Sequence, residues 1–316
     1  MFELVFLGTS ASAPSVLRGL PAQIVLAEEY RFLVDCGEGT QRQLLKSGIG
    51  FKRLNRILLT HGHLDHILGL AGLLSTFMRW ESIDSLEIWG GRHTLDRVQD
   101  LIYGVVLRGQ RPPMPIHLVD LQPGIAFDTK KFTIEAFPVT HRGPGNFGFI
   151  FAEKPRRPFL AERAEALGVP AGPERSRLSA GESVTLADGR IIHPDDVLGE
   201  VMPGARLVLI GDIARTDNLP ESIHGADALV MEATYRSDEA NFAEDFGHMT
   251  AARAAAYAQE ASVKTLILTH LSRRNRERDI LDEAAAIFPN TFVARDFDRF
   301  SIVKNQPVTR LEPAKA

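Results

Sequence analysis

Thr60-His61-Gly62-His63-Leu64-Asp65-His66 is the most informative segment of this 316-residue chain. It follows an apolar, β-branched run at 56–60 and precedes an apolar segment with helical periodicity. Its imidazole nitrogens and carboxylate oxygens suit zinc and related divalent ions. In an extended turn His61 and His63 project to the same side, whereas Asp65 and His66 enter a helix and point toward a neighbouring position. The stretch therefore predicts two adjacent metal sites at a strand end; the alternative is a polar loop with chance histidines.

Three later residues are candidates to complete these metal sites. His141 follows the run 132–140, Asp212 follows 206–211, and His270 follows 265–269. All three stand at the carboxyl ends of expected strands, where α/β sheets usually gather their functional residues. Taken singly, each could be structural, but together with the first stretch they complete a dinuclear set. Asp212 is the natural bridge, because one carboxylate can share its oxygens between two ions.

Composition places the chain among ordinary globular proteins, with 44% apolar and 24% charged residues. A net charge of −4 gives no global attraction to nucleic acid, so any RNA contact has to come from local basic surface. The first eight residues carry an early acid and too short an apolar run for a signal peptide or a membrane span. Cys36 is the single cysteine and cannot form an intramolecular disulfide, which agrees with a reducing compartment. We therefore expect a cytoplasmic protein.

The order of the expected elements indicates two mixed sheets with helices outside. Apolar runs rich in β-branched residues predict strands at 3–7, 23–26, 31–35, 56–60, 86–89, 132–139, 147–152, 206–210, 228–231, 265–269 and 291–294. Helical periodicity appears at 38–46, 66–77, 95–106, 250–260 and 276–288. The stretch 153–203, rich in Pro, Gly and charge, interrupts this order. We expect a single domain over 1–316 with 153–203 as an inserted arm that has a short helix of its own.

The combined ligand set resembles the dinuclear site of metallo-β-lactamase-fold hydrolases, and within that superfamily the chain resembles ribonuclease Z from about residue 2 to 303. The arm is one of two features that point to ribonuclease Z within the superfamily. Gly172-Pro173 and then the segment 181–190 resemble the flexible arm with which that family grips tRNA. His248 is the second such feature, since Gly247-His248-Met249-Thr250 resembles a His-Ser-Thr motif of the ribonuclease Z family. Other segments that match the family pattern are Phe6-Leu7-Gly8-Thr9-Ser10, Asp35-Cys36-Gly37-Glu38-Gly39-Thr40-Gln41, Glu232-Ala233-Thr234-Tyr235 and Ile267-Leu268-Thr269-His270-Leu271-Ser272.

The resemblance implies an α/β fold, the four-layer αββα sandwich of the metallo-β-lactamases. It implies a zinc-dependent endoribonuclease that removes the 3′ trailer of precursor tRNA by metal-hydroxide attack, leaving a 3′-hydroxyl on the tRNA and a 5′-phosphate on the trailer. The implied cofactors are two Zn²⁺ per subunit, with Mn²⁺ as an alternative. The implied partners are precursor tRNA and a second copy of the chain, since in the family one subunit's arm holds tRNA for the other subunit's site. The metal ligands would be His61, His63, Asp65, His66, His141, Asp212 and His270.

Four residues receive further roles on this reading. Asp65 would both bind a metal and act as orienter or base for the attacking water, with pure ligation as the alternative. His248 would contact the scissile phosphate and help to protonate the leaving oxygen; the alternative is a histidine that caps a helix. Arg274 would pair with phosphate, unless it is part of a solvated helix face. Glu232 would support a ligand histidine from behind, unless it is a buried acid bonded to the backbone.

Three departures from the family pattern keep a rival reading open. Val16 stands where a basic residue is usual, Gly19 where asparagine is usual, and Met249 where serine is usual. They favour a small-molecule hydrolase of the same fold, acting on a lactone, thioester, β-lactam or sulfate ester with the arm as a lid. The long arm, with its Gly172-Pro173, favours the tRNA endonuclease.

Overall fold

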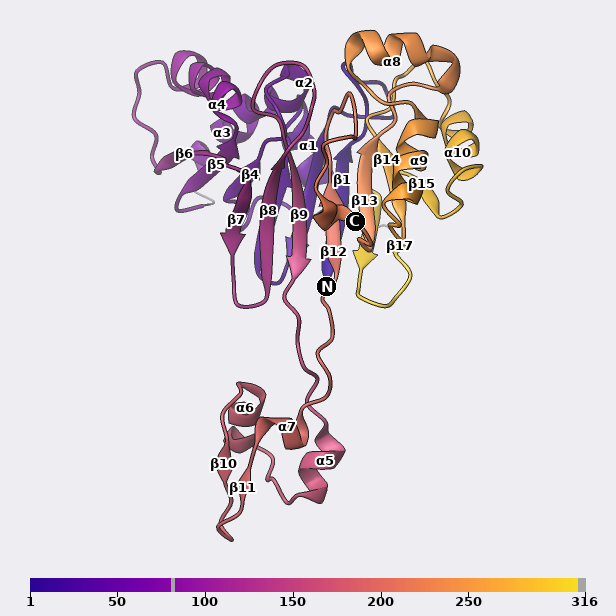
Figure 1. Ribbon diagram of the computed structural model, residues 1–316. Coiled ribbons are helices and arrows are strands. Elements are labelled where there is room, and N and C mark those ends of the chain that lie inside the picture. The colour runs from indigo at the N-terminus through magenta and orange to yellow at the C-terminus, as the bar shows by residue number, and fades with distance from the viewer. Residues whose placement is uncertain (81–82, 312–316) are drawn as a thin grey trace. The chain divides into compact units, whose positions relative to one another are not determined.

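The computed structural model describes residues 1–80 and 83–311 (Figure 1). The chain divides into two compact units: a main unit made of Met1–Ala152 and the chain from Ala205 onward, and an arm unit, Glu153–Gly204. Within the described residues, no helix is both long and apolar enough to cross a membrane.

The first sheet of the main unit begins at the N-terminus and has eight strands in the order β17-β16-β1-β2-β3-β4-β5-β6. Strand β1 pairs antiparallel with β16 on one side and with β2 on the other, whereas β3 to β6 run parallel. The strands are β1 Phe2–Gly8, β2 Ala22–Ala27, β3 Tyr30–Val34, β4 Arg56–Leu58, β5 Leu86–Gly90, β6 Ile116–Asp120, β16 Arg299–Ile302 and β17 Thr309–Leu311.

The second sheet has seven strands in the order β15-β14-β13-β12-β9-β8-β7. Strands β12 to β15 are parallel, and β9 pairs antiparallel with β12, with Ala152 opposite Arg206. The strands are β7 Gly124–Asp128, β8 Phe132–Pro138, β9 Phe147–Glu153, β12 Arg206–Leu209, β13 Ala228–Glu232, β14 Leu266–Thr269 and β15 Thr291–Val293.

The two sheets pack face to face through a phenylalanine-rich core. Phe2 and Phe32 of the first sheet contact Phe132 and Phe151 of the second, with ring centroids 5.6–6.2 Å apart and edge-to-face geometry. A second apolar cluster joins the outer face of the first sheet to the helices α1 (Thr40–Lys46), α3 (Gly69–Trp80) and α4 (Arg92–Gln99). A third joins the second sheet to α9 (Ala251–Glu260) and α10 (Glu277–Ala285). The helices therefore lie outside the paired sheets (Figure 1), and the predicted four-layer αββα sandwich is confirmed.

The helices of the main unit differ in part from the expected ones. The helix expected at 95–106 begins earlier, at Arg92, and changes to a π-helix at Asp100, which apolar periodicity does not distinguish. The helix α8 was not expected. The main-unit helices are α1 Thr40–Lys46, α2 Leu64–Ile67, α3 Gly69–Trp80, α4 Arg92–Gln99, η1 Asp100–Leu107, η2 Glu221–Ile223, η3 Ser237–Glu239, α8 Ala240–Phe246, α9 Ala251–Glu260 and α10 Glu277–Ala285.

The arm unit has more structure than the single short helix expected for it. Its helices and its small antiparallel hairpin enclose a core of their own, which includes Ala164, Leu178 and Val197. Its elements are α5 Ala161–Ala166, α6 Pro173–Ser179, β10 Val184–Thr185, β11 Ile191–Ile192 and α7 Pro194–Val197. Its bounds, 153–204, differ by one residue from the predicted 153–203.

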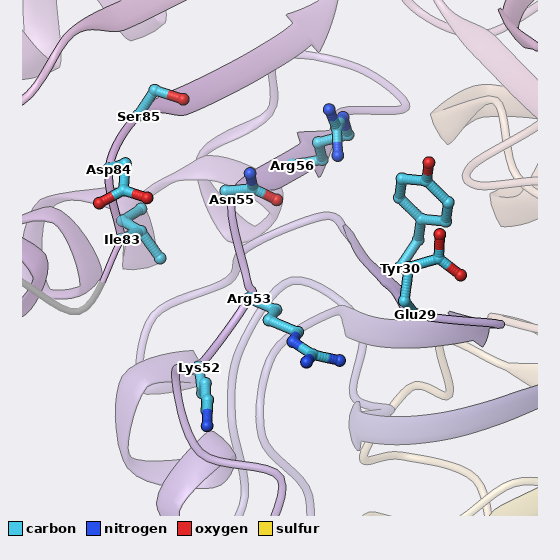
Figure 2. A pocket seen from close by; sticks show the side chains of 9 residues that line it. All are labelled: Glu29, Tyr30, Lys52, Arg53, Asn55, Arg56, Ile83, Asp84 and Ser85. Carbon is cyan, nitrogen blue, oxygen red and sulfur yellow. The ribbon is translucent and has the colours of Figure 1, made fainter.

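A hollow of about 540 Å³ lies at the amino-terminal ends of β4 and β5 (Figure 2). Lys52, Arg53 and Arg56 share it with Glu29 and Asp84, so its charges are mixed. The expected metal ligands follow the opposite, carboxyl ends of the strands. This hollow is therefore separate from the candidate site.

Candidate metal centre

The first candidate metal pocket combines residues from both sheets. His61 and His63 follow β4 of the first sheet, and His141 and Asp212 follow β8 and β12 of the second. Their ligand atoms lie within 4.8 Å of one another. Asp212 Oδ2 is 3.5 Å from His61 Nε2 and 3.8 Å from His141 Nε2, and His63 Nδ1 is 3.3 Å from His141 Nε2. The four side chains therefore converge on one point.

The second pocket lies on the other side of Asp212. Asp65 and His66 belong to α2, and His270 directly follows β14. Asp212 Oδ1 is 3.4 Å from His66 Nε2 and 3.3 Å from His270 Nε2, while Asp65 Oδ2 is 3.8 and 3.6 Å from the same two nitrogens. The two oxygens of Asp212 thus face different pockets, as expected of a bridging carboxylate. The structure brings all seven expected ligands together.

Several buried atoms of this cluster lack a protein partner, as expected of metal ligands. His61 Nε2, His66 Nε2, His270 Nε2 and Asp212 Oδ1 are buried and have no hydrogen-bond partner among the described residues. A buried polar atom without a partner costs free energy of about 1–3 kcal/mol. Neutral imidazole and carboxylate are the ligand types that divalent transition metals prefer. The donor set therefore fits two divalent ions.

Hydrogen bonds on the side away from the cluster hold four of the five ligand rings in one tautomer. Thr60 Oγ1 donates to Asp35 and therefore accepts from His61 Nδ1 at 3.0 Å. In the same way Thr234 Oγ1 donates to Glu232 and accepts from His270 Nδ1 at 2.9 Å. His66 Nδ1 donates to Asp35 Oδ2 at 2.8 Å, and His141 Nδ1 donates to Gly247 O at 2.7 Å. In these four rings Nδ1 carries the proton and the Nε2 lone pair points into the cluster, whereas His63 turns its Nδ1 toward His141.

Two of these residues occupy strained backbone at strand ends. Asp35, directly after β3, has φ 59°, and His270, directly after β14, has φ 57°. Left-handed backbone is uncommon outside glycine and often marks functional sites. The sequence pattern predicts His270 but misses Asp35, Thr60 and Thr234 as ring partners. Asp35 could have been found by the strand-end argument that identified Asp212, because it follows a buried strand that runs parallel to β4.

The pKa shifts in the first pocket favour metal ligation. Burial, with the neighbouring imidazoles, lowers the pKa of His61 well below its usual value, and burial also lowers the pKa of His63 and His141. These rings are therefore neutral near pH 7. Burial opposes the ionised form of Asp212, but His270, His66 and His61 outweigh it and hold the pKa of Asp212 well below its usual value. Neutral rings around an anionic carboxylate are ready to bind a cation.

In the second pocket, burial opposes the charge on His66, but Asp212 and Asp35 outweigh it and raise the pKa of His66 well above its usual value. A proton on His66 competes with a metal ion there. Burial likewise opposes ionisation of Asp65, but the nearby His270 and His66 rings hold the pKa of Asp65 far below its usual value. Asp65 is therefore a weak base, better suited to orienting a water than to removing its proton. Ser12 N donates to Asp65 Oδ2 at 3.0 Å and fixes that carboxylate.

Glu232 differs in detail from its expected role. Its direct imidazole partner is His248, whose Nδ1 lies 2.9 Å from Glu232 Oε1, and it reaches the expected ligand His270 through Thr234. Burial opposes the charge on His248, but Glu232 outweighs it and raises the pKa of His248 to about 9. His248 is thus protonated near pH 7 and lies beside the cluster, 3.8 Å from Asp212 Oδ2.

Arg274 lies outside the ligand cluster. Its guanidinium is 3.4 Å from Glu239 Oε1 and 5.5 Å from the ring centroid of Phe242, and its side chain is largely exposed. Its contact with phosphate stays a prediction. Of the three departures from the family pattern, Val16 is fully exposed, Gly19 N donates to Asp296, and Met249 is buried in the core of the second sheet.

Comparisons with known proteins cover nearly the whole chain. Residues 30–161 and 173–271 match the model of the beta-lactamase superfamily domain. The chain is 50% identical over 302 residues to a ribonuclease Z of Bradyrhizobium diazoefficiens, which covers 96% of this chain and 100% of that protein. It is 38% identical to a ribonuclease Z of Listeria monocytogenes, over 95% of this chain and 99% of that one.

Solved structures agree with this similarity. The short form of human tRNase Z superimposes with a TM-score of 0.68 at 26% identity, over 95% of this chain and 99% of that one. The metallo-beta-lactamase fold protein YhfI of Bacillus subtilis gives the same TM-score at 18% identity, over 95% and 100% of the two chains, and shares the fold.

Proposed function

Because this chain belongs to the ribonuclease Z family, within the β-lactamase superfamily, we propose that it is a metal-dependent endoribonuclease that removes the 3′ trailer from precursor tRNA. The observation that carries this proposal is the 50% identity over the full length of a ribonuclease Z, which includes the arm unit. The metal cluster alone would also fit a small-molecule hydrolase of this fold. We further propose two Zn²⁺ per subunit, with Mn²⁺ as an alternative, a homodimer, and a cytoplasmic location.

The residues of the cluster would have two roles, metal binding and orientation of the attacking water. His61, His63 and His141 would hold one ion, Asp65, His66 and His270 the other, and Asp212 both. When bound, such ions supply charge stabilisation for the phosphate and a more acidic water. Asp65, ionised and fixed by Ser12 N, would orient that water for attack in line with the leaving 3′-oxygen. The products would be a tRNA with a 3′-hydroxyl and a trailer with a 5′-phosphate.

The proposed function is tested by incubating the metal-loaded protein with a labelled precursor tRNA that carries a 3′ trailer. We expect one cut at the acceptor-stem junction, a 5′-phosphate on the released trailer, and no cut with His63→Ala. Chromogenic lactones, thioesters, β-lactams and sulfate esters are assayed beside it. Turnover of one of these, without cleavage of the precursor, would replace the proposal with the small-molecule hydrolase.

His248 is proposed to protonate the leaving 3′-oxygen. Its pKa, raised to about 9, keeps the ring protonated at neutral pH, so the proton is available there and is lost as the pH rises through that value. Bound cations beside His248 lower its pKa from this value, so we expect kcat for precursor tRNA to fall at alkaline pH, at or below about pH 9. His248→Gln should lower kcat about 10²-fold or more and remove this alkaline fall. Cleavage of bis-p-nitrophenyl phosphate, whose leaving group needs no proton, is expected to change little.

The control for this prediction is His224→Gln, since His224 is exposed and lies outside the metal cluster. Equal losses on both substrates would instead make His248 a structural support of the metal centre.

A further inference from the structure

Helix α8 exposes its aromatic side chains and buries little of its surface in the core. Phe242 and Phe246 are 45% and 43% exposed, and Ala243 is the one buried residue of the helix. Four residues apart, they lie on one helical face, with ring centroids 6.5 Å apart and planes 25° apart. Tyr235, just after β13, continues the row at 6.5 Å and 28° from Phe242. These three rings form what we call the aromatic strip.

Each exposed ring of the aromatic strip has an arginine over it. The guanidinium of Arg274 lies 5.5 Å from the centroid of Phe242, and that of Arg142 lies 5.1 Å from the centroid of Phe246. Both arginines are held in place: Arg142 donates to Asp245 O at 2.6 Å, and Arg274 pairs with Glu239. The strip is therefore an ordered array of flat surfaces and planar cations.

The aromatic strip is continuous with the metal centre. Gly247 ends α8 in the left-handed conformation, and its carbonyl accepts the hydrogen bond from the ligand His141. The ring of Tyr235 lies 6.1 Å from that of His248. Helix α8 also lies at the same edge of the main unit as α2, which carries Asp65 and His66 (Figure 1). A substrate strand that leaves the metal centre past His248 therefore meets the strip first.

We propose that the aromatic strip stacks the unpaired nucleotides next to the scissile phosphate of the RNA substrate, an inference that rests on the proposed function. Every base offers a π-face, and exposed aromatic rings with arginines over them match single-stranded RNA. Glu244 and Asp245, exposed between the two phenylalanines, offset the charge of the arginines, so attraction to phosphate is not the main force. The main force in this proposal is the stacking of the bases on the rings.

The test is a cycle of protein and substrate changes. Phe242→Leu/Phe246→Leu keeps an apolar surface and removes the rings; Phe242→Tyr/Phe246→Tyr keeps the rings. Each is assayed on precursor tRNA with normal nucleotides and with abasic nucleotides on either side of the cleaved bond. We expect the leucine variant to raise KM for the intact precursor about tenfold or more, and the tyrosine variant to leave it near wild type.

On at least one of the abasic precursors, the leucine variant and the wild type should become equal, because the ring and the base act as a pair. Tyr103→Ala is the matched control, since Tyr103 is also 43% exposed but lies on the helix η1, outside the aromatic strip. Cleavage of bis-p-nitrophenyl phosphate should be unchanged throughout.

Three outcomes would overturn the proposal. One is a leucine variant that cleaves intact precursor like wild type, and another is a loss that is the same on intact and on both abasic precursors. The third is a change in oligomeric state without a KM effect, which would make the strip a protein contact. In all three the wild type still cuts precursor tRNA, so the proposed function stands. A wild type inactive on intact precursor removes the proposed function, and this proposal with it.

Discussion

Asp212→Ala is expected to lower hydrolysis of both precursor tRNA and bis-p-nitrophenyl phosphate by about 10³-fold or more. Among the residues that the structure describes, Asp212 is the one carboxylate that faces both pockets, with Oδ1 toward His66 and His270 and Oδ2 toward His61 and His141. Its loss leaves no shared ligand between two cations and removes the negative charge around which the imidazoles gather. The transition state then loses several kcal/mol of charge stabilisation.

Metal content and thermal stability separate this effect from misfolding. Wild type is expected to bind two divalent ions per chain and to melt several degrees higher when they are added, because ligands of the folded state stabilise it. Asp212→Ala should bind fewer ions and show a smaller rise. Asp227→Ala is the matched control: Asp227 is equally buried but pairs with Lys264 and Lys304, so its loss should lower stability and spare metal binding. An Asp212→Ala protein with two ions and full activity would contradict the bridging role.

Removal of the arm unit is expected to raise KM for precursor tRNA about 10²-fold and to leave bis-p-nitrophenyl phosphate hydrolysis nearly unchanged. The deletion can be made cleanly, because β9 and β12 are antiparallel neighbours with Ala152 opposite Arg206. An Asn-Gly turn in place of residues 154–204 should close them into a hairpin. Equal effects on both substrates would argue that the arm unit serves the main unit's stability and not RNA binding.

The charges of the arm unit show where phosphate contacts are expected. Arg157, Arg177 and Arg190 are paired with carboxylates of the same unit, whereas the exposed Arg156 and Arg163 have no such partner. Replacing Arg156 and Arg163 with alanine should therefore reduce the slope of log affinity against log salt by about one per arginine. Arg177→Ala, which removes a paired arginine, is the control and should change the slope less.

The proposed homodimer adds a complementation test to the arm deletion. Mixing the arm-deleted protein with His63→Ala protein pairs an intact metal centre with an intact arm. If one subunit's arm serves the other's centre, the mixture should regain precursor cleavage that neither protein has alone. A mixture as inactive as its parts would argue for action within one chain.

The sequence predicts the central strands well because of where they lie. Strands β12, β13 and β14 are covered on both faces, so they appear as continuous apolar runs. Asp212 and His270, which follow two of these strands, lie beside His61 and His66 in the structure. Strands at or near the sheet edges were missed: β7 has Ile125 exposed, and β17 is exposed along its length. A strand with one open side does not need an apolar run.

What the sequence misses near the metal centre depends on tertiary contacts. Helix α8 buries Ala243 alone and turns its phenylalanines outward, so it has no apolar stripe toward the core that periodicity could detect. The direct pairing of Glu232 with His248 joins the end of β13 to the loop after α8, and nothing in the local pattern of either segment indicates it. The position of a residue just after a strand indicates the candidate ligands. The partners of those ligands can be identified only from the folded chain.

The pairing of β1 with β16 has a consequence for how the protein is made. Phe2 stands opposite Ile302, so the second edge of β1 stays uncovered until a strand about 300 residues further along the chain has been made. While the ribosome is still adding the second sheet, β1 presents a row of unpaired amides and carbonyls to its surroundings. We therefore expect a chain that ends before β16 to expose this edge of β1 and to be more prone to aggregation than the full chain.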